Sequence, residues 1–346
     1  MRPLKPDGRI DLEHRAYFLR GSPDGSGIVA ASEDGNVSLV DLASNSVRLQ
    51  RPTTTLHAIC LHPTKLLLAC VGGKSGSLVV RSLAGKSVAE VEPPRIKEGA
   101  SKSRTPGFAN CYFDESGDVL WLVAPVSDDE CELSLVETKG WSVVQSAAVE
   151  DEFGASAFSF HYTGRPGLVS LWIAAGQDGQ QVYWLKRKGV GFALQRVDEL
   201  TNCIPPVFSP DGSEFLVVTE DNAICRYSFA RTKQIGSPLE SGDEDNPFAE
   251  SLCYLDDRHA FAGTGEGRLF LVDTEKLRIE EEVAIEGHEP RPIGEYFPTL
   301  AKERGLGTDI AWFTRLGNVI VFAFRRDRGT GLKAWKDSLL WYSVKK

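Results

Sequence analysis

The sequence lacks the features that mark helical, secreted and membrane-spanning proteins. Helical periodicity is nearly absent from its 346 residues, and Met1 is the only methionine. No stretch of about 18 consecutive apolar residues exists, which argues against a transmembrane helix. The first residues, MRPLKPDGRIDLEHRAYF, carry acids early and contain no apolar signal core. We therefore expect a cytoplasmic protein that does not enter a membrane.

A disulfide framework is also missing. The cysteines are odd in number and scattered, and each lies in or beside an apolar run, at positions 60, 70, 111, 131, 203, 225 and 253. That pattern favours reduced, buried thiols in a reducing compartment. Cys60 and Cys70 are the one pair that could face each other across a hairpin.

Excess positive charge is absent as well. The formal net charge is −9, with 48 acidic residues against 39 lysines and arginines. Such a balance disfavours a protein whose main task is to coat nucleic acid or an anionic membrane. A local basic patch remains compatible with it.

The chain does contain an internal repeat. Residues 22–42, SPDGSGIVAASEDGNVSLVDL, and residues 209–229, SPDGSEFLVVTEDNAICRYSF, share a tight turn, an apolar run, an acidic turn and an alternating run. Weaker copies lie between and after them. Seven first turns can be aligned: SPDG, HPTK, DESG, YTGRPG, SPDG, LDDR and TRLG. Seven units of about 49 residues match the usual length of a propeller blade with its loops.

Each unit has the pattern of a four-stranded sheet. The second strand is apolar on both faces, as in KLLLACV and EFLVVT, which is typical of a strand between two neighbouring sheets. The third strand alternates and the fourth is more polar, as in RIEEEVA. A single sheet of this kind would leave apolar faces wet, whereas seven arranged radially cover one another.

The sequence therefore predicts an all-β fold, a seven-bladed β-propeller in one domain, 1–346, with six or eight blades as the alternatives. The last unit lacks a fourth strand, and GRIDLE (8–13) is a spare strand near the N-terminus. We expect this strand to complete the last blade and close the ring. The expected blades are 14–50, 55–91, 107–147, 155–197, 202–239, 248–284 and 308–344 plus 8–13.

Two stretches carry a resemblance to a known family. EDGNVSLVDL (33–42) and GEGRLFLVDTEKL (265–277) resemble the second half of a WD repeat, whose third strand usually ends in Trp-Asp. Asp41 and Asp273 keep the terminal aspartate, while valine replaces the tryptophan. EDGNVSLVDLASNSV also resembles the YVTN type of bacterial propeller repeat. Either resemblance implies a propeller and leaves the function open.

Four long insertions interrupt the repeat, at 92–107, 240–250, 286–307 and 325–337. Each lies between two units or between the second and third strands of a unit. Since strand direction alternates, all four are expected at the same ends of the blades. Loops aimed by a rigid scaffold often carry function, although loops also tolerate insertion by drift.

Charge and aromatic residues in these insertions suggest a surface for a protein or peptide partner. Residues 325–336 are basic, residues 240–250 are acidic, and a bipolar surface suits a partner of complementary charge. Aromatic residues beside arginines are typical of interface hot spots, although they could instead pack on the blades. The candidate binding residues are Arg95, Lys97, Asp243, Glu244, Asp245, Tyr296, Phe297, Arg325, Arg326, Arg328, Lys333, Trp335 and Lys336.

No complete catalytic or metal-binding motif is present. His57 points away from Cys60 and His62 on a strand, so three-ligand capture of a metal is awkward. GTGEG (263–267) precedes a strand and not a helix, which removes the argument for a phosphate loop. We therefore predict no cofactor and no small-molecule substrate. Residues near the central channel that could serve a catalytic site are His14, His161, Glu250 and Asp309.

The function predicted from the sequence is a non-catalytic protein-interaction scaffold, or a subunit of a larger complex, that binds through the inserted loops. The alternative is a propeller hydrolase of the lactonase type, with a polar site at the channel. A nucleic-acid contact through the basic loops is the third possibility, and its binding would fall steeply with salt.

Overall fold

The computed structural model describes most of the chain as β-structure. Its described residues form 28 strands and contain no helix long and apolar enough to cross a membrane. Residues outside the described part are 1–3, 23–24, 99, 101–106, 152–156, 175–179, 199, 201–204, 220, 241–247, 265–267, 287–309, 329–334 and 345–346. The side chains of 249–251, 310–312, 325–328 and 335 are likewise not described.

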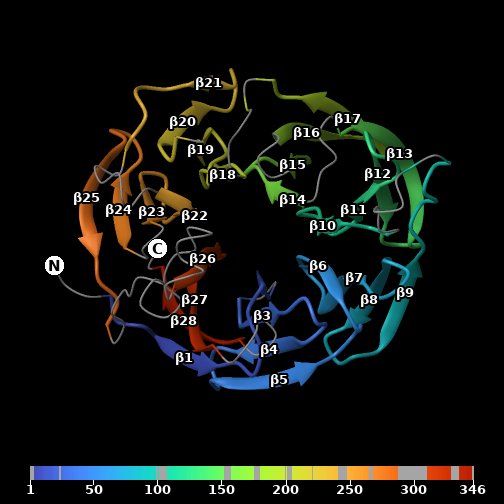
Figure 1. Cartoon of the computed structure of the whole chain (residues 1–346), viewed down its shortest axis with the longest axis horizontal. Helices are drawn as coiled ribbons and strands as arrows, with labels where there is room; N and C mark the ends of the chain where they lie inside the picture. The colour runs from blue at the N-terminus through green and yellow to red at the C-terminus, as the bar shows by residue number, and fades with distance from the viewer. Residues whose placement is uncertain are drawn as a thin grey trace. The chain divides into compact units, whose positions relative to one another are not determined.

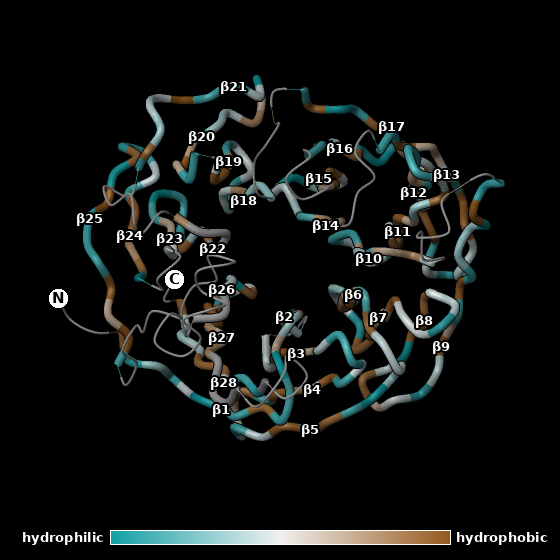
Figure 2. The backbone as a smooth tube through the Cα atoms, viewed as in Figure 1, coloured by the Kyte–Doolittle hydropathy of each residue, from teal (hydrophilic) through white to brown (hydrophobic). Residues whose placement is uncertain are grey.

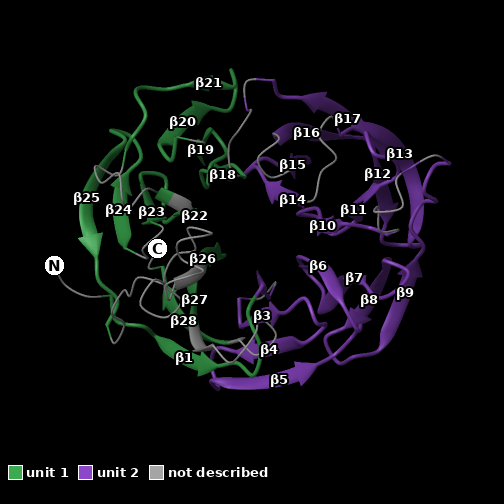
Figure 3. Ribbon diagram, viewed as in Figure 1, with its two compact units in different colours: residues 1–16, 203–346 green, residues 17–202 purple. Residues whose placement is uncertain are grey.

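The strands form seven four-stranded sheets, and each sheet is an antiparallel meander (Figure 1). Two compact units divide them, unit 1 with residues 1–16 and 203–346 and unit 2 with residues 17–202 (Figure 3). Each unit is considered by itself below. The chain has the fold of a seven-bladed β-propeller, as the repeat predicted.

Unit 2 holds four blades. Blade 1 contains β2 (Phe18–Gly21), β3 (Gly27–Ala31), β4 (Val37–Asp41) and β5 (Ser46–Gln50). Blade 2 contains β6 (Leu56–Leu61), β7 (Leu67–Gly72), β8 (Ser77–Ser82) and β9 (Ser87–Val91). Blade 3 contains β10 (Asn110–Phe113), β11 (Val119–Pro125), β12 (Glu130–Glu137) and β13 (Ser142–Glu150). Blade 4 contains β14 (Ala157–Tyr162), β15 (Leu168–Ala174), β16 (Gln180–Lys188) and β17 (Gly191–Arg196).

Unit 1 holds three blades. Blade 5 contains β18 (Val207–Phe208), β19 (Glu214–Val218), β20 (Ile224–Ser228) and β21 (Lys233–Gln234). Blade 6 contains β22 (Phe248–Tyr254), β23 (His259–Thr264), β24 (Leu269–Asp273) and β25 (Arg278–Val283). Blade 7 contains β26 (Ile310–Leu316), β27 (Val319–Arg328), β28 (Trp335–Ser343) and β1 (Gly8–Asp11).

The burial of the strands follows the pattern read from the sequence. In β11 the first six residues are buried, whereas four of the five residues of β5 are exposed. Hydrophobic residues gather on the strands and hydrophilic ones at many of the turns (Figure 2). Between blades 3 and 4 the core is built from side chains such as Trp121, Leu133 and Leu171, all fully buried. A strand with neighbours on both faces gains from being apolar on both, which explains the loss of alternation.

The N-terminal strand completes blade 7, as predicted. β1 pairs antiparallel with β28, with Gly8 opposite Trp341 and Asp11 opposite Ser338. Any side chain at Gly8 would collide with the Trp341 ring, so a glycine is required there. Leu12, the residue after β1, is fully buried and donates its N–H to Asp337 O at 2.8 Å.

The first turn of a blade repeats the same backbone geometry. Gly25, Gly117 and Gly212 occupy equivalent places in blades 1, 3 and 5, with φ of 70°, 73° and 65°. That left-handed conformation is open to glycine at little cost, which explains the recurring Asp-Gly and Ser-Gly pairs. In blade 5 the Ser209 hydroxyl also bonds the Asp211 carboxylate at 2.7 Å, which holds the turn.

Candidate functional site

The insertion 92–107 leaves blade 2 after β9 and enters blade 3 at β10. Arg95 and Lys97, two of the predicted binding residues, are exposed. The Lys97 ammonium lies 2.5 Å from Glu130 Oε1, and its backbone N–H donates to Val126 O at 2.8 Å. These contacts hold the start of the insertion against the β11–β12 turn, so Lys97 is partly committed to blade 3 whereas Arg95 points to solvent.

The insertion 325–337 is more regular than the sequence suggested. β27 continues through Arg328 and β28 begins at Trp335, so both ends of the segment are paired strand. A bulge between Arg325 and Asp327 lets the pairing continue beyond the apolar core. The expectation that all of 325–337 lies between the second and third strands was wrong, because backbone pairing does not require apolar side chains.

Only one of the basic candidates in this hairpin has a described side chain. Lys336 is half-buried, and its ammonium lies 2.5 Å from Glu13 Oε2. The next residue, Asp337, is fully buried and its Oδ2 accepts the Ala16 N–H at 2.8 Å. The remaining candidates lie outside the described residues or side chains: Asp243, Glu244, Asp245, Tyr296, Phe297, Arg325, Arg326, Arg328, Lys333 and Trp335.

Two of the four channel candidates are described. His14 is buried, its Nδ1 lies 2.9 Å from Arg15 O, and its own carbonyl accepts the Asp337 N–H at 3.2 Å. His161 lies half-buried on β14, the first strand of blade 4. Asp309 and the side chain of Glu250 lie outside the description. The two described histidines belong to different units, so each is judged on its own surroundings.

His161 forms the closest approach to a nucleophile–base pair. The Ser159 hydroxyl lies 2.7 Å from His161 Nε2, two residues apart on one face of β14. Burial, aided by the charge of Arg20, lowers the pKa of His161 to about 4. A general base works best with a pKa near the working pH, and this imidazole is too weak for that at neutral pH. The pair is therefore best explained as a hydrogen bond that satisfies a half-buried histidine.

The cysteine and histidine residues of HAICLH do not gather into a metal site. His57 is exposed, while Cys60 and His62 are buried, and within the described part of the chain no three His, Cys, Asp or Glu side chains are placed to hold a metal. Cys60 Sγ lies 3.4 Å from Cys111 Sγ on the neighbouring blade, and its register partner across the hairpin is Ala69. Cys60 and Cys70 therefore do not face each other, and the six described cysteines are free and buried, as the sequence predicted.

His62 has a structural role that the sequence did not reveal. Its Nδ1 accepts the backbone N–H groups of Thr64 and Lys65 at 3.2 and 3.1 Å. Its ring packs on Phe113 and lies against Gly117 of the next blade. Burial and the charge of Lys65 lower its pKa. A neutral imidazole accepting through Nδ1 thus closes one turn and fills the junction with another blade.

Arginines join other neighbouring blades at these same turns. Arg187 Nη1 lies 2.9 Å from Asp114 Oδ2, between blades 4 and 3. Arg226 Nη1 donates to Glu275 O at 2.7 Å, between blades 5 and 6. Arg315 Nη1 donates to Leu255 O at 2.5 Å, between blades 7 and 6. An arginine inside an alternating strand, as in ICRYSF, was the signal that could have found the blade 5 contact.

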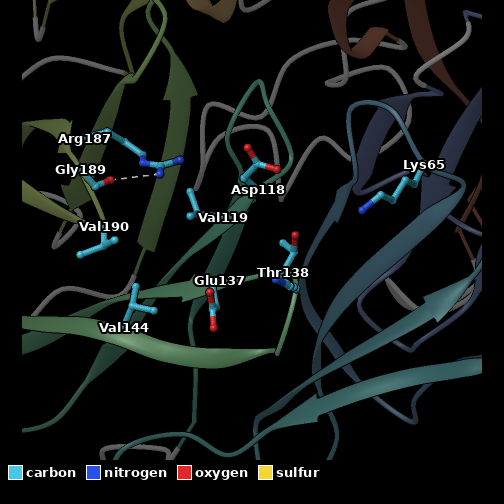
Figure 4. A pocket seen from close by; sticks show the side chains of 10 residues that line it. Lys65, Asp118, Val119, Glu137, Thr138, Val144, Arg187, Gly189 and Val190 are labelled. Carbon is cyan, nitrogen blue, oxygen red and sulfur yellow. Dashed lines mark hydrogen bonds between the residues drawn. The ribbon is translucent and has the colours of Figure 1, made fainter.

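One hollow is described in unit 2, at the turns of blades 2, 3 and 4 (Figure 4). Its volume is about 480 Å³, and its lining includes Lys65, Asp118, Glu137, Val144 and Val190. It opens at the ends of the blades opposite the insertion 92–107, because first-to-second and third-to-fourth strand turns surround it. None of the binding residues predicted from the sequence lines it.

Comparisons with known proteins agree with the fold and go no further. No family model matches the chain, and no curated protein matches its sequence. Among solved structures, the chain is similar to the β-propeller domain of Cps50 (Swd1) from Myceliophteria thermophila. The TM-score is 0.62 at 11% identity, over 98% of this chain and 100% of that domain. At that identity the likeness supports the propeller fold, and the affiliation with WD repeats stays a prediction.

Proposed function

We propose that the protein is a non-catalytic scaffold that binds a protein or peptide partner through its inserted segments, as a subunit of a larger complex. The observation that carries this proposal is the placement of the insertions on their blades. Within unit 1, three insertions join β21 to β22, β25 to β26, and β27 to β28. In an antiparallel meander such connections leave the sheet at the same end. One end of this unit therefore carries three added segments.

The charges of these segments give the surface its expected specificity. The 240–250 segment contributes Asp243, Glu244 and Asp245, and the β27–β28 hairpin contributes Arg325 and Arg326 among its bases. Two patches of opposite sign favour one orientation of a complementary partner and disfavour others. In unit 2 the exposed Arg95 adds a base at the corresponding end of its blade. A rigid propeller that aims variable loops supports the same reading.

The hydrolase alternative has one observation in its favour, the hydrogen bond between Ser159 and His161. The low pKa of this histidine weighs against it, because the imidazole would accept a proton poorly at neutral pH. The scaffold is therefore the proposal, and ester or lactone hydrolysis is the activity to assay if the experiment below captures no partner.

The test is affinity capture from the native cell extract with quantitative mass spectrometry, using matched baits. One variant replaces 329–334 by a two-residue Gly-Ser turn. Its replacement stops short of Asp337 because that buried carboxylate holds the Ala16 N–H. A second variant carries Asp243→Asn, Glu244→Gln and Asp245→Asn. The control is Lys188→Gln, an exposed charge in the last residue of β16, at the opposite blade end.

The proposal expects a stoichiometric protein partner with the unaltered bait and the control, and its loss with at least one insertion variant. A partner that binds all four baits equally would refute the binding surface. If no bait captures a partner above background, the scaffold proposal fails, and the purified chain should then be assayed for ester and lactone hydrolysis.

A further inference from the structure

The hollow in unit 2 is formed by turns from three successive blades. Lys65 comes from the β6–β7 turn, Asp118 from the β10–β11 turn, Lys139 from the β12–β13 turn and Val190 from the β16–β17 turn. A volume of about 480 Å³ is within the range of sites that accept a small ligand or a few side chains. The blade ends around it carry no long insertion, so it is separate from the surface proposed above.

The walls of the hollow are fixed before anything binds. Arg187 is held by Asp114 at 2.9 Å, and Asp114 is only 2% exposed. Gln145 on β13 accepts the Phe192 N–H at 2.8 Å and donates to the Phe192 carbonyl at 3.3 Å. These bonds tie blades 3 and 4 together on two sides of the hollow. A preformed site loses little conformational entropy on binding.

One end of the hollow is apolar. Val119 is buried, while Val144 and Val190 are exposed, Val190 to 85%. Val190 stands at the tip of a tight turn next to Gly189, whose φ is +59°. β-branched side chains are stiff, so these valines lose little rotamer freedom when covered. An apolar side chain placed between them would remove exposed apolar surface from water.

The charged side chains of the hollow have a defined spatial order from one side of it to the other. Figure 4 shows Asp118 and Glu137 in the middle, with the valines on one side and Lys65 on the other. Among the described residues, no ion pair involves Asp118, Glu137, Lys65 or Lys139, and Glu137 Oε1 accepts the Ser142 hydroxyl at 3.1 Å. Arg187 differs, because Asp114 already neutralises it. The available charges are therefore two carboxylates next to the apolar end and Lys65 beyond them, while Lys139 follows Thr138 on the β12–β13 turn.

We propose that this hollow binds an extended peptide segment of a partner protein with an apolar, a basic and an acidic side chain in that order along the groove. The apolar side chain would lie between Val144 and Val190. The basic side chain would meet Asp118 and Glu137, and the acidic one would meet Lys65. This order follows from charge complementarity, which fixes register as well as partner choice. The inference stands apart from the scaffold proposal, since it concerns the other ends of the blades.

The experiment measures fluorescence anisotropy of labelled nine-residue peptides with the purified full chain. The peptides carry one Leu, one Arg and one Glu in a Gly-Ser frame, spaced by two or three positions. One set has Arg in the middle, in both chain directions, and the matched set has Glu in the middle. We expect binding with Arg in the middle to be tighter by about fivefold or more.

Two variants then locate the peptide. Val190→Asp should weaken binding by removing the apolar contact, and Lys65→Glu should weaken binding by about fivefold. A peptide with Lys in place of its Glu should recover affinity on Lys65→Glu, because the charges are exchanged. The control Lys188→Glu should bind normally, since Lys188 neighbours Arg187 on β16 and points to the other face of the sheet.

Three outcomes would overturn the inference. They are the absence of binding by every peptide, equal binding by both sets, and unchanged binding by Val190→Asp. Circular dichroism of each variant, matched to the unaltered chain, separates lost binding from lost folding. The capture experiment on the insertions can succeed or fail independently, because none of its binding variants touches this hollow.

Discussion

The ion pair between Asp114 and Arg187 gives the sharpest stability prediction. It joins the first turn of blade 3 to the third strand of blade 4 at 2.9 Å. The Asp114 side chain is 2% exposed and that of Arg187 is 25% exposed. Asp114 also accepts the Ser116 hydroxyl at 2.9 Å. The perturbation is a double-mutant cycle made of Asp114→Ala, Arg187→Ala and the double variant.

The magnitude follows from the burial of the two partners. Breaking a fully buried pair by removing one partner costs about 3–5 kcal/mol, because the other charge is left uncompensated. Water can reach part of Arg187, so we expect Asp114→Ala to lower the free energy of unfolding by about 2–3 kcal/mol. The double variant should lose less than the sum, with a coupling of about 1–2 kcal/mol. The exposed pair of Lys97 and Glu130 should couple by about 0–1 kcal/mol.

The assay is urea unfolding followed by tryptophan fluorescence. Trp121 on β11 and Trp184 on β16 lie in the two blades that the pair joins, so the signal reports on this junction. A coupling below about 0.5 kcal/mol, equal to that of the exposed pair, would refute the reasoning. It would mean that packing alone, and not the ion pair, holds these blades together.

Two further predictions concern a glycine and a buried acid. Gly117→Ala should destabilise the chain by about 1–3 kcal/mol in urea unfolding, because φ is +73° and the new methyl group meets the buried His62 ring. Gly85→Ala, with φ +92° and no atom within 4 Å, isolates the backbone contribution, and an equal loss there would contradict the clash. The Lys276 N–H, with help from Arg258, lowers the pKa of Asp273 to about 2 from its ordinary 3.8. The ionised Asp273 carboxylate stabilises the fold above about pH 4, and this stabilisation is lost as the pH falls toward 2. Asp273→Asn should therefore reduce the change in the free energy of unfolding between about pH 4 and pH 2. An unchanged pH profile of acid unfolding would refute this prediction.

The fold could be predicted from the sequence because its signals are local. A blade needs a glycine turn, an apolar run and a second turn within about 40 residues, and these lie next to one another in the chain. The pairing of β1 with β28 could also be predicted, because the last unit lacked a fourth strand and GRIDLE was a strand without a unit of its own. The lengths of the strands were harder to predict. β27 extends to Arg328 because its backbone pairs across a bulge, and the polar side chains there give no sign of this pairing in the sequence.

The contacts between blades could not be predicted in the same way. Cys60 meets Cys111 and not Cys70 because the first strands of adjacent blades pack on each other. The sequence of one blade does not show how its first strand is shifted along that of the next blade. The hollow joins turns separated by more than a hundred residues, from Lys65 to Val190, and depends on how three sheets stack. The insertions were found easily because they lengthen the repeat. A site made of turns of ordinary length causes no such change in the repeat, so the sequence does not indicate it.

The pairing of β1 with β28 sets an order of events during synthesis. Asp11 meets Ser338 across 327 positions, and the Ser338 hydroxyl bonds the Asp11 carboxylate at 2.6 Å. At about 5–20 residues per second, the ribosome needs roughly 15–65 s to supply the partner strand. During that interval β1 waits without its neighbour, and an unpaired strand invites association with other chains. Arg9 and Asp11, the outward-facing residues of β1, are charged and exposed, which keeps the waiting strand soluble until the last blade can be assembled.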